Sequence, residues 1–210
     1  MAGHVDLGGQ GRAIDASDWL DEPLGSFIEQ IADETPAPGA GSTAAIVLSM
    51  AAALVEMATS FASAHGLEAV RDRAHEIRGR VSGLASADGR AYGRVLEALR
   101  LETGDEHTQQ LEDAVAGAIA VPMEVLELAA EVAVLAADVA ETGNRNLEGD
   151  ALAGSLLAEA AARSAATLAQ LNASMLSRHA VAEAHLERLR PALARATRAR
   201  ERAVMAYANL

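Results

Sequence analysis

The chain is organised around the stretch Pro36-Ala37-Pro38-Gly39-Ala40-Gly41-Ser42-Thr43, which leads directly into the apolar segment 44–58. Two prolines and two glycines predict a turn that cannot be helical, and Ser42 or Thr43 is the expected N-cap of the helix behind it. A helix that starts at a glycine turn presents unpaired backbone N–H groups and the positive end of its dipole, and glycines let a ligand approach the backbone. The stretch is therefore a candidate floor for an anionic or carbonyl-bearing ligand. The alternative is a plain connection between two helices.

The composition predicts an all-α protein. Half of the 210 residues are hydrophobic, only 2% are aromatic, and alanine is abundant. Strand-forming residues are sparse, so the core is expected to form by close contact between helices rather than around large rings. This length suits one domain with a sizeable core.

Several classes of site and partner are disfavoured by the residues that the chain lacks. All 17 basic residues are arginine and there is no cysteine, which excludes Schiff-base lysines, the phosphate-loop lysine, thiolate nucleophiles and cysteine-based zinc sites. The histidines have no metal-ligand spacing, so no metal is predicted. The net charge of −13 argues against nucleic acid or an anionic membrane surface as the partner.

The two apolar or terminal segments that could direct the chain to a membrane have other interpretations. Residues 1–20 lack the basic start and apolar core of a secretory signal, so a cytoplasmic location is expected. The segment 44–64 is long and apolar, but it contains Ser49, Glu56 and Thr59 and is rich in alanine rather than leucine. It predicts a buried central helix that is apolar on all sides.

Apolar periodicity and turn residues predict an antiparallel bundle of about five to seven helices. Residues 1–20 are expected to be a flexible segment, and residues 21–210 a single helical domain. Pro122 is expected to kink or divide its helix, and Gly143 with Asn144 to form a left-handed C-cap. The expected helices span residues 26–34, 42–64, 67–101, 106–141, 147–178 and 180–208.

Two polar groupings stand out against this apolar pattern. Asp88 and Tyr92 are spaced i,i+4, so a carboxylate and a phenol share one helix face. A solvated Asp beside a half-buried Tyr would explain the pair equally well. The stretch 143–150 gathers Asn144, Arg145, Asn146 and Asp150 around a predicted helix start, and an N-cap loop would explain only part of that cluster.

Taken in order, these pieces resemble the formiminotransferase-cyclodeaminase C-terminal family, which includes stand-alone cyclodeaminases and methenyltetrahydrofolate cyclohydrolases. The similarity extends over about residues 24 to 205, and the ordered set is far more specific than any one piece. The matching motifs are Pro38-Gly39-x-Gly41-Ser42, Leu54-x-x-Met57, Asp88-x-x-Ala91-Tyr92, Val121-Pro122 and Gly143-Asn144-x-Asn146 with Asp150.

The resemblance implies a helical homodimer whose substrate is a tetrahydrofolate derivative. Cyclisation of 5-formiminotetrahydrofolate with loss of ammonia, or hydrolysis of 5,10-methenyltetrahydrofolate to the 10-formyl form, would each need a proton-transfer group, for which Asp88 is the candidate. Tyr92 would orient Asp88 or pack on the pterin ring. The implied substrate-binding residues are Pro38, Gly39, Gly41, Ser42, Asn144, Arg145, Asn146 and Asp150, with Arg145 the cation for a carboxylate tail.

Three interpretations stay open at this point. The motif order favours a folate enzyme. Ala40 replaces the family's usual glycine, and residues 59–70 are shorter than usual and lack the usual basic residues, which favours a catalytically weakened relative that binds a folate-like ligand or assists a partner enzyme. A purely structural helical bundle has only the composition in its favour.

Overall fold

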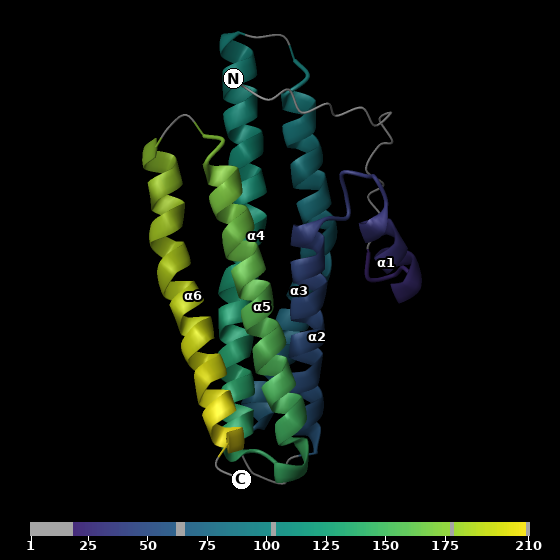
Figure 1. The fold of residues 1–210 in the computed structure, drawn as a ribbon, viewed down its shortest axis with the longest axis vertical. Helices are drawn as coiled ribbons and strands as arrows, with labels where there is room; N and C mark the ends of the chain where they lie inside the picture. Colours follow the sequence, from purple (N-terminus) through teal and green to yellow (C-terminus); the bar gives the residue numbers. More distant parts are fainter. Residues whose placement is uncertain (1–18, 62–65, 102–103, 177–178, 209–210) are drawn as a thin grey trace.

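The computed structural model describes residues 19–61, 66–101, 104–176 and 179–208. Five long helices run up and down in alternation as an antiparallel bundle, and a short sixth helix lies to one side (Figure 1). The described residues contain no strand, so the predicted all-α class and helix number are confirmed. The elements are α1 Leu24–Ala32, α2 Ala40–Ser60, α3 Glu68–Ala98, α4 Asp105–Thr142, the 3-10 helix η1 Arg145–Leu147, α5 Glu148–Ala173 and α6 His179–Ala208.

Alanine makes the core of this bundle, as the composition predicts. Most of the fully buried side chains are alanine and valine, with a few larger residues such as Leu48, Ile77 and Leu126 between them. At Gly154 of α5, an added Cβ would lie 3.4 Å from the carbonyl oxygen of Ala51 in α2. The two backbones are therefore only about one methyl group apart at this point, a separation that only small residues permit.

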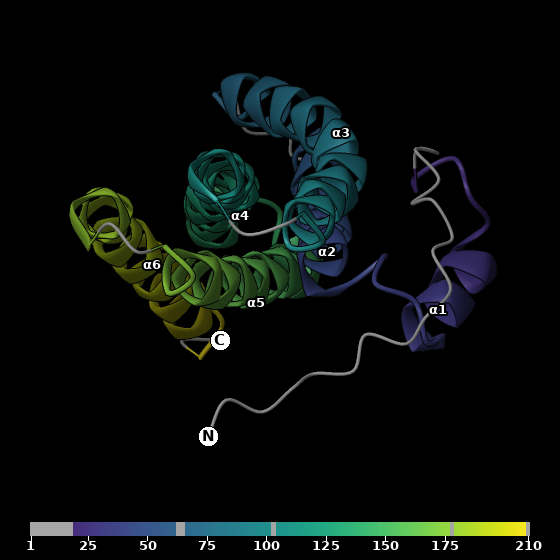
Figure 2. The same ribbon diagram turned by 90° about the horizontal axis from the view of Figure 1, so that it is seen from above.

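The helix that follows the proline-glycine turn begins earlier than expected and is less enclosed. Gly39 is the N-cap of α2, so the predicted caps Ser42 and Thr43 both lie inside the first turn. The hydroxyl of Thr43 donates to the Gly39 carbonyl at 2.8 Å. Viewed from above, α2 packs against α3, α4 and α5 and leaves its remaining side uncovered (Figure 2).

Among the described helices, α2 is the one whose length and apolar composition would allow it to cross a bilayer, and half of that window is buried within the bundle. The expectation of a helix enclosed on all sides is therefore wrong. One face of α2 is a core face, and the other is a partly exposed apolar face on which Met50 and Ala53 are exposed and Val47, Leu54 and Met57 are half-buried.

Pro122 does not divide its helix. Helix α4 runs without interruption through all 38 of its residues, although Pro122 cannot donate to the carbonyl of Ala118 four residues earlier. The side-chain amide of Asn172 in α5 donates to that carbonyl at 2.7 Å. A side chain from a neighbouring helix thus replaces the missing backbone hydrogen bond.

Smaller differences concern helix ends. Helix α1 begins after Pro23, so Ser26 is inside the helix rather than its cap. Helix α4 ends at Gly143 in an extended conformation (φ −82°), not a left-handed one, and Asn144 instead caps η1. The N-terminal segment predicted to be flexible lies, up to residue 18, outside the described residues, as does His65.

Candidate functional site

The N-terminus of α2 lies directly against Asp88 of α3. The backbone N–H and the hydroxyl of Ser42, in the first turn of α2, both serve the Asp88 carboxylate as hydrogen-bond donors. The hydroxyl lies 3.4 Å from Asp88 Oδ2 and donates more closely, at 2.9 Å, to the carbonyl of Ala85 one turn earlier on α3. Ser42 is fully buried, so this contact joins the two helices out of water.

Gly41 is what allows the two helices to come this close. A Cβ built at position 41 would overlap the carboxyl group of Asp88 itself. Alanine or any larger residue would therefore displace the carboxylate or the helix. Ala40, which replaces a glycine of the family pattern, is exposed, so the methyl group that it adds is not buried against α3.

The surroundings of Asp88 change the pKa of its carboxyl group. Burial raises the pKa of its carboxyl group above the ordinary value, and the two hydrogen bonds from Ser42 act in the opposite direction without cancelling the rise. A carboxyl group with a raised pKa can both take up and release a proton nearer neutral pH than an exposed aspartate can. Asp88 is therefore not the solvated aspartate of the alternative interpretation.

Tyr92 lies one turn beyond Asp88 on α3, and 39% of it is exposed. The hydrogen bonds found among the described residues do not include one between its hydroxyl and Asp88. A role in orienting Asp88 through a hydrogen bond is therefore unsupported by this geometry. Stacking of the phenol ring on a ligand stays a prediction.

The second polar grouping lies at the other end of α2. The amide of Asn144 donates to the carbonyl of Phe61 at 3.2 Å, and its oxygen accepts from the backbone N–H of Asn146 at 3.0 Å. Asn144 therefore holds the loop 143–147 in shape and ties it to the C-terminal end of α2. The guanidinium of Arg145 is 75% exposed, with its Nε 3.7 Å from Glu148.

The predicted site residues consequently form two groups rather than one. Pro38, Gly39, Gly41, Ser42 and Asp88 meet at the start of α2, whereas Asn144, Arg145, Asn146 and Asp150 lie near its end. Helix α2 has 21 residues and spans about 30 Å at 1.5 Å per residue. A single chain therefore does not place both groups around the same one-carbon centre.

Two further residues, Glu148 and Asn172, had no role assigned to them from the sequence. The Oε2 atom of Glu148 is buried and has no hydrogen-bond partner in the described structure, and its side chain is only 13% exposed. Asn172 completes the hydrogen bonding of α4 at Pro122. The i−4 spacing between Pro122 and Ala118 identifies the carbonyl that needs a donor, but no local pattern connects it to position 172.

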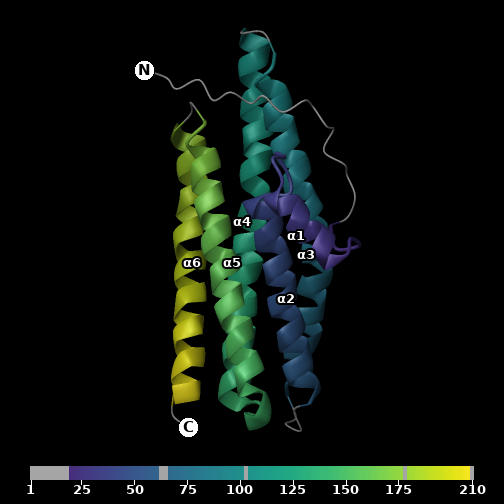
Figure 3. The same ribbon diagram turned by 45° about the vertical axis from the view of Figure 1, so that its right-hand side comes forward.

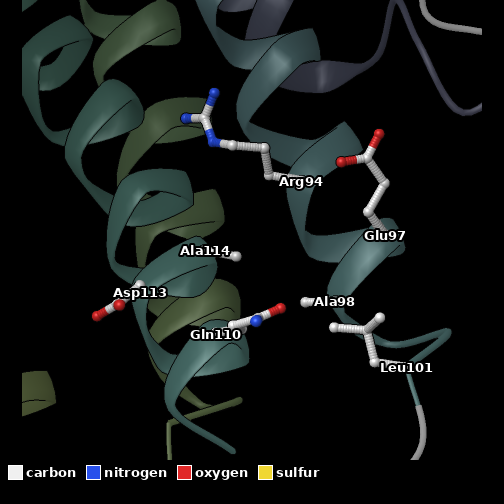
Figure 4. Close-up of a pocket in the computed structure, with 7 residues that line it drawn as sticks. All are labelled: Arg94, Glu97, Ala98, Leu101, Gln110, Asp113 and Ala114. Atoms are coloured by element: carbon white, nitrogen blue, oxygen red, sulfur yellow. The ribbon is translucent and has the colours of Figure 1, made fainter. Parts of the chain in front are cut away.

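One cavity among the described residues is separate from both groups. It has a volume of about 470 Å³ and opens between the end of α3 and the start of α4, with Arg94 reaching across from α3 and Asp113 pointing away from it (Figure 4). None of the predicted site residues lines it. Its walls are Arg94, Glu97, Ala98, Leu101, Gln110, Asp113 and Ala114. Within the described part of the chain, no three acidic or histidine side chains group as a metal site would require.

Comparison with known proteins gives a consistent set of relatives. The family model for formiminotransferase-cyclodeaminase matches residues 23–191. A methenyltetrahydrofolate cyclohydrolase of Methylorubrum extorquens is 31% identical over 194 residues, which cover 86% of this chain and 93% of the relative. A formimidoyltransferase-cyclodeaminase of Sus scrofa is 30% identical over 138 residues, or 60% of this chain and 26% of that longer protein. The crystal structure of a formiminotetrahydrofolate cyclodeaminase from Thermotoga maritima superposes with a TM-score of 0.81 at 26% identity, covering 89% of this chain and 96% of that one.

Proposed function

Because the chain belongs to the formiminotransferase-cyclodeaminase family, we propose that Asp88 is the proton-transfer group of a folate one-carbon reaction. The protein is an enzyme of the cyclodeaminase or methenyltetrahydrofolate cyclohydrolase kind. The observation that supports Asp88 is its position, half-buried against the first turn of α2 and bonded to Ser42. The family's proline-glycine turn and its acid therefore belong to one site.

Both candidate reactions require this carboxylate to accept a proton and then return it. In cyclisation, N10 of 5-formiminotetrahydrofolate attacks the carbon of the protonated formimino group (–CH=NH2+). N10 loses a proton, and the departing NH2 group gains one as ammonia leaves, which gives the methenyl cation. In hydrolysis, water adds to the methenyl carbon and loses one proton, which leaves a hydroxyl group on that carbon. The bond from the carbon to N5 then breaks as N5 is protonated, and the hydroxyl loses its own proton to solvent as the carbonyl of the 10-formyl form is made. Asp88 accepts the first proton and returns it to the leaving nitrogen in either case. A positioned acid-base group of this kind is worth about 10²- to 10⁴-fold in rate.

Gly41 and Ser42 hold the carboxylate of Asp88 in position against α2. Two donors from Ser42 fix it against α2, and the absent side chain at Gly41 leaves room for it there. The positive end of the α2 dipole favours the charged form when the proton has moved to substrate. Burial favours the protonated form, so the two protonation states are closer in free energy than in an exposed aspartate.

We further propose that the enzyme is a homodimer whose copies pair through the exposed face of α2. The apolar side chains Val47, Met50, Leu54, Met57 and Phe61 follow one line along that helix, and Met50 and Phe61 are 42% and 65% exposed. Paired about a two-fold axis perpendicular to α2, the two copies of this helix would run antiparallel. The loop 143–150 of the second copy would then lie beside Asp88 of the first, which would unite the two groups of site residues.

Two assays on parent and Asp88→Asn test the catalytic role. They follow the absorbance of 5,10-methenyltetrahydrofolate and the release of ammonia from the formimino form. We expect turnover in one of them to fall at least 100-fold in the variant while folate affinity changes little. Turnover within a few-fold of the parent would remove Asp88 from the mechanism. A parent that binds folate without turnover would favour the catalytically weakened relative.

Mixed dimers test the composite site. Asp88→Asn and Arg145→Glu would each lower activity alone at low folate concentration, and co-expression would restore activity if the two residues act across the interface. One site of each mixed dimer would then have neither substitution. Failure of the mixture to exceed the sum of the separate variants would place the two residues in different functions.

A further inference from the structure

Helix α1 lies beside the bundle rather than within it (Figures 2 and 3). Its connection to α3 is made by Trp19, whose backbone N–H donates to Ser86 Oγ at 3.3 Å. The Trp19 ring in turn meets Phe27 of α1 with 6.2 Å between centroids. These two aromatic residues are only 5% and 3% exposed, so they form a small buried anchor at the base of α1.

The rest of the apolar face of α1 is uncovered by the described residues. Leu24, Ile28 and Ile31 follow the i,i+4,i+7 spacing that places them on one side of a helix, and they are 55%, 56% and 38% exposed. Phe27 borders this stripe, so the anchor covers one edge of it only. A helix of nine residues is unstable in water by itself and depends on packing, which makes such a stripe a surface that another element covers.

The charges around this stripe favour a protein rather than a lipid surface. Helices that lie on membranes are typically rich in Lys and Arg on their polar face. The segment 19–35 has no basic residue, and an anionic headgroup layer would repel its acids. These acids are Asp21, Glu22, Glu29, Asp33 and Glu34.

The partly exposed apolar line along α2 is a second apolar surface. Helices α1 and α2 together would supply the area that a stable dimer interface needs. A face of α2 about 30 Å long and 10 Å wide would bury only about 600 Å² in total between two copies, whereas stable interfaces bury about 1,200 Å² or more. Helix α1 lies on the uncovered side of α2, level with its N-terminal half (Figure 3). In an antiparallel pair, that position faces the C-terminal half of α2 in the second copy, where Met57 and Phe61 are.

We propose that α1 is a clasp, whose stripe Leu24, Ile28 and Ile31 packs on the α2 end of a second copy around Phe61. This inference rests on the proposed homodimer and adds the element that fastens it. Each copy contributes one clasp, so the two-fold pairing includes two such contacts.

The first test replaces the stripe without disturbing the anchor. The triple variant Leu24→Ser, Ile28→Ser, Ile31→Ser should raise the dimer dissociation constant in sedimentation by about 100-fold. Trp19 is the single tryptophan of the chain, and its unchanged emission would show that the anchor is intact. The matched control is Val204→Ser with Tyr207→Ser, two exposed positions on α6, on the far side of the bundle, which should leave the constant unchanged. An unchanged constant in the triple variant would overturn the clasp and leave the dimer standing, whereas a monomeric parent would overturn both.

A cross-link gives a second readout that does not depend on a destabilising change. The chain has no cysteine, so Ile28→Cys and Phe61→Cys introduce the only thiols. Within one chain, α1 lies level with the N-terminal half of α2 and Phe61 follows its C-terminal end, so these two positions are too far apart to form a disulfide (Figure 3). We expect the double variant to form a covalent dimer under mild oxidation and each single variant to do so far less. A dimeric double variant that stays uncross-linked would refute the contact between α1 and Phe61.

Discussion

Substitution of Gly41 by alanine tests the central geometric claim about the site without touching Asp88. The added methyl group would overlap the carboxyl group, so the carboxylate must rotate away from α2 and lose its hydrogen bonds from Ser42. Each hydrogen bond to a charged group contributes about 1.5 to 3 kcal/mol, and alanine returns up to about 1 kcal/mol of helix propensity. The two bonds together amount to about 3 to 6 kcal/mol, so we expect the free energy of unfolding to fall by at most about 2 to 5 kcal/mol, and by less where the displaced carboxylate regains hydration.

The rate of catalysis should fall as well, and it is measured separately from stability. A proton-transfer group that is displaced by about 1 Å or more loses its alignment, and we expect kcat to fall by about 100-fold, which corresponds to about 2.7 kcal/mol of activation free energy. Turnover is measured in the two folate assays, and the free energy of unfolding by urea denaturation on the same preparations.

The control for this prediction is Gly79→Ala on α3, where an added Cβ meets nothing within 4 Å. That variant should keep the parent's kcat and gain up to about 1 kcal/mol of stability. If Gly41→Ala turns over within a few-fold of the parent while remaining folded, the position of the carboxylate against α2 is not what catalysis requires.

Three further predictions concern other residues of the site and its support. Arg145→Ala should weaken binding of polyglutamylated folate more than binding of the monoglutamate, because a desolvated charge-assisted contact to a tail carboxylate contributes about 1.5 to 3 kcal/mol. Equal losses of affinity for both ligands in a calorimetric titration would show that Arg145 does not bind the tail. Asn172→Leu should lower the free energy of unfolding by about 1 to 3 kcal/mol in urea, because it leaves the Ala118 carbonyl without a donor, and an unchanged midpoint would show that water replaces the amide. The raised pKa of Asp88 means that the folded state binds the proton more tightly than the unfolded state does. The contribution of this group to stability is therefore lost as the pH rises above 3.8, the ordinary pKa of an aspartate. Asp88→Asn should gain stability relative to the parent with rising pH, and a difference in melting temperature that stays constant with pH would contradict the burial argument.

Most of the fold follows from local features of the sequence. Helix periods, glycine turns and the abundance of alanine identify all six helices to within a few residues, because each of these signals acts over one or two turns. The exceptions are the division that was one of the expectations at Pro122 and the full enclosure expected of α2. Both depend on neighbours that are distant in the sequence: Asn172 repairs the hydrogen bond at the proline, and the arrangement of α3, α4 and α5 decides which side of α2 stays uncovered.

The site divides in the same way between local and distant information. Gly41, Ser42 and Asp88 were identified from ordered motifs, but their meeting is a tertiary contact that neither the turn nor the i,i+4 spacing of Asp88 and Tyr92 specifies. The separation of the loop 143–150 from Asp88 follows from a length that the sequence already contains, since a helix of 21 residues spans about 30 Å. Residues that belong to one motif set but lie at opposite ends of a helix can still meet on one ligand if that helix pairs antiparallel with its copy. An apolar line along the exposed side of the helix is what such a pairing requires, and α2 has one.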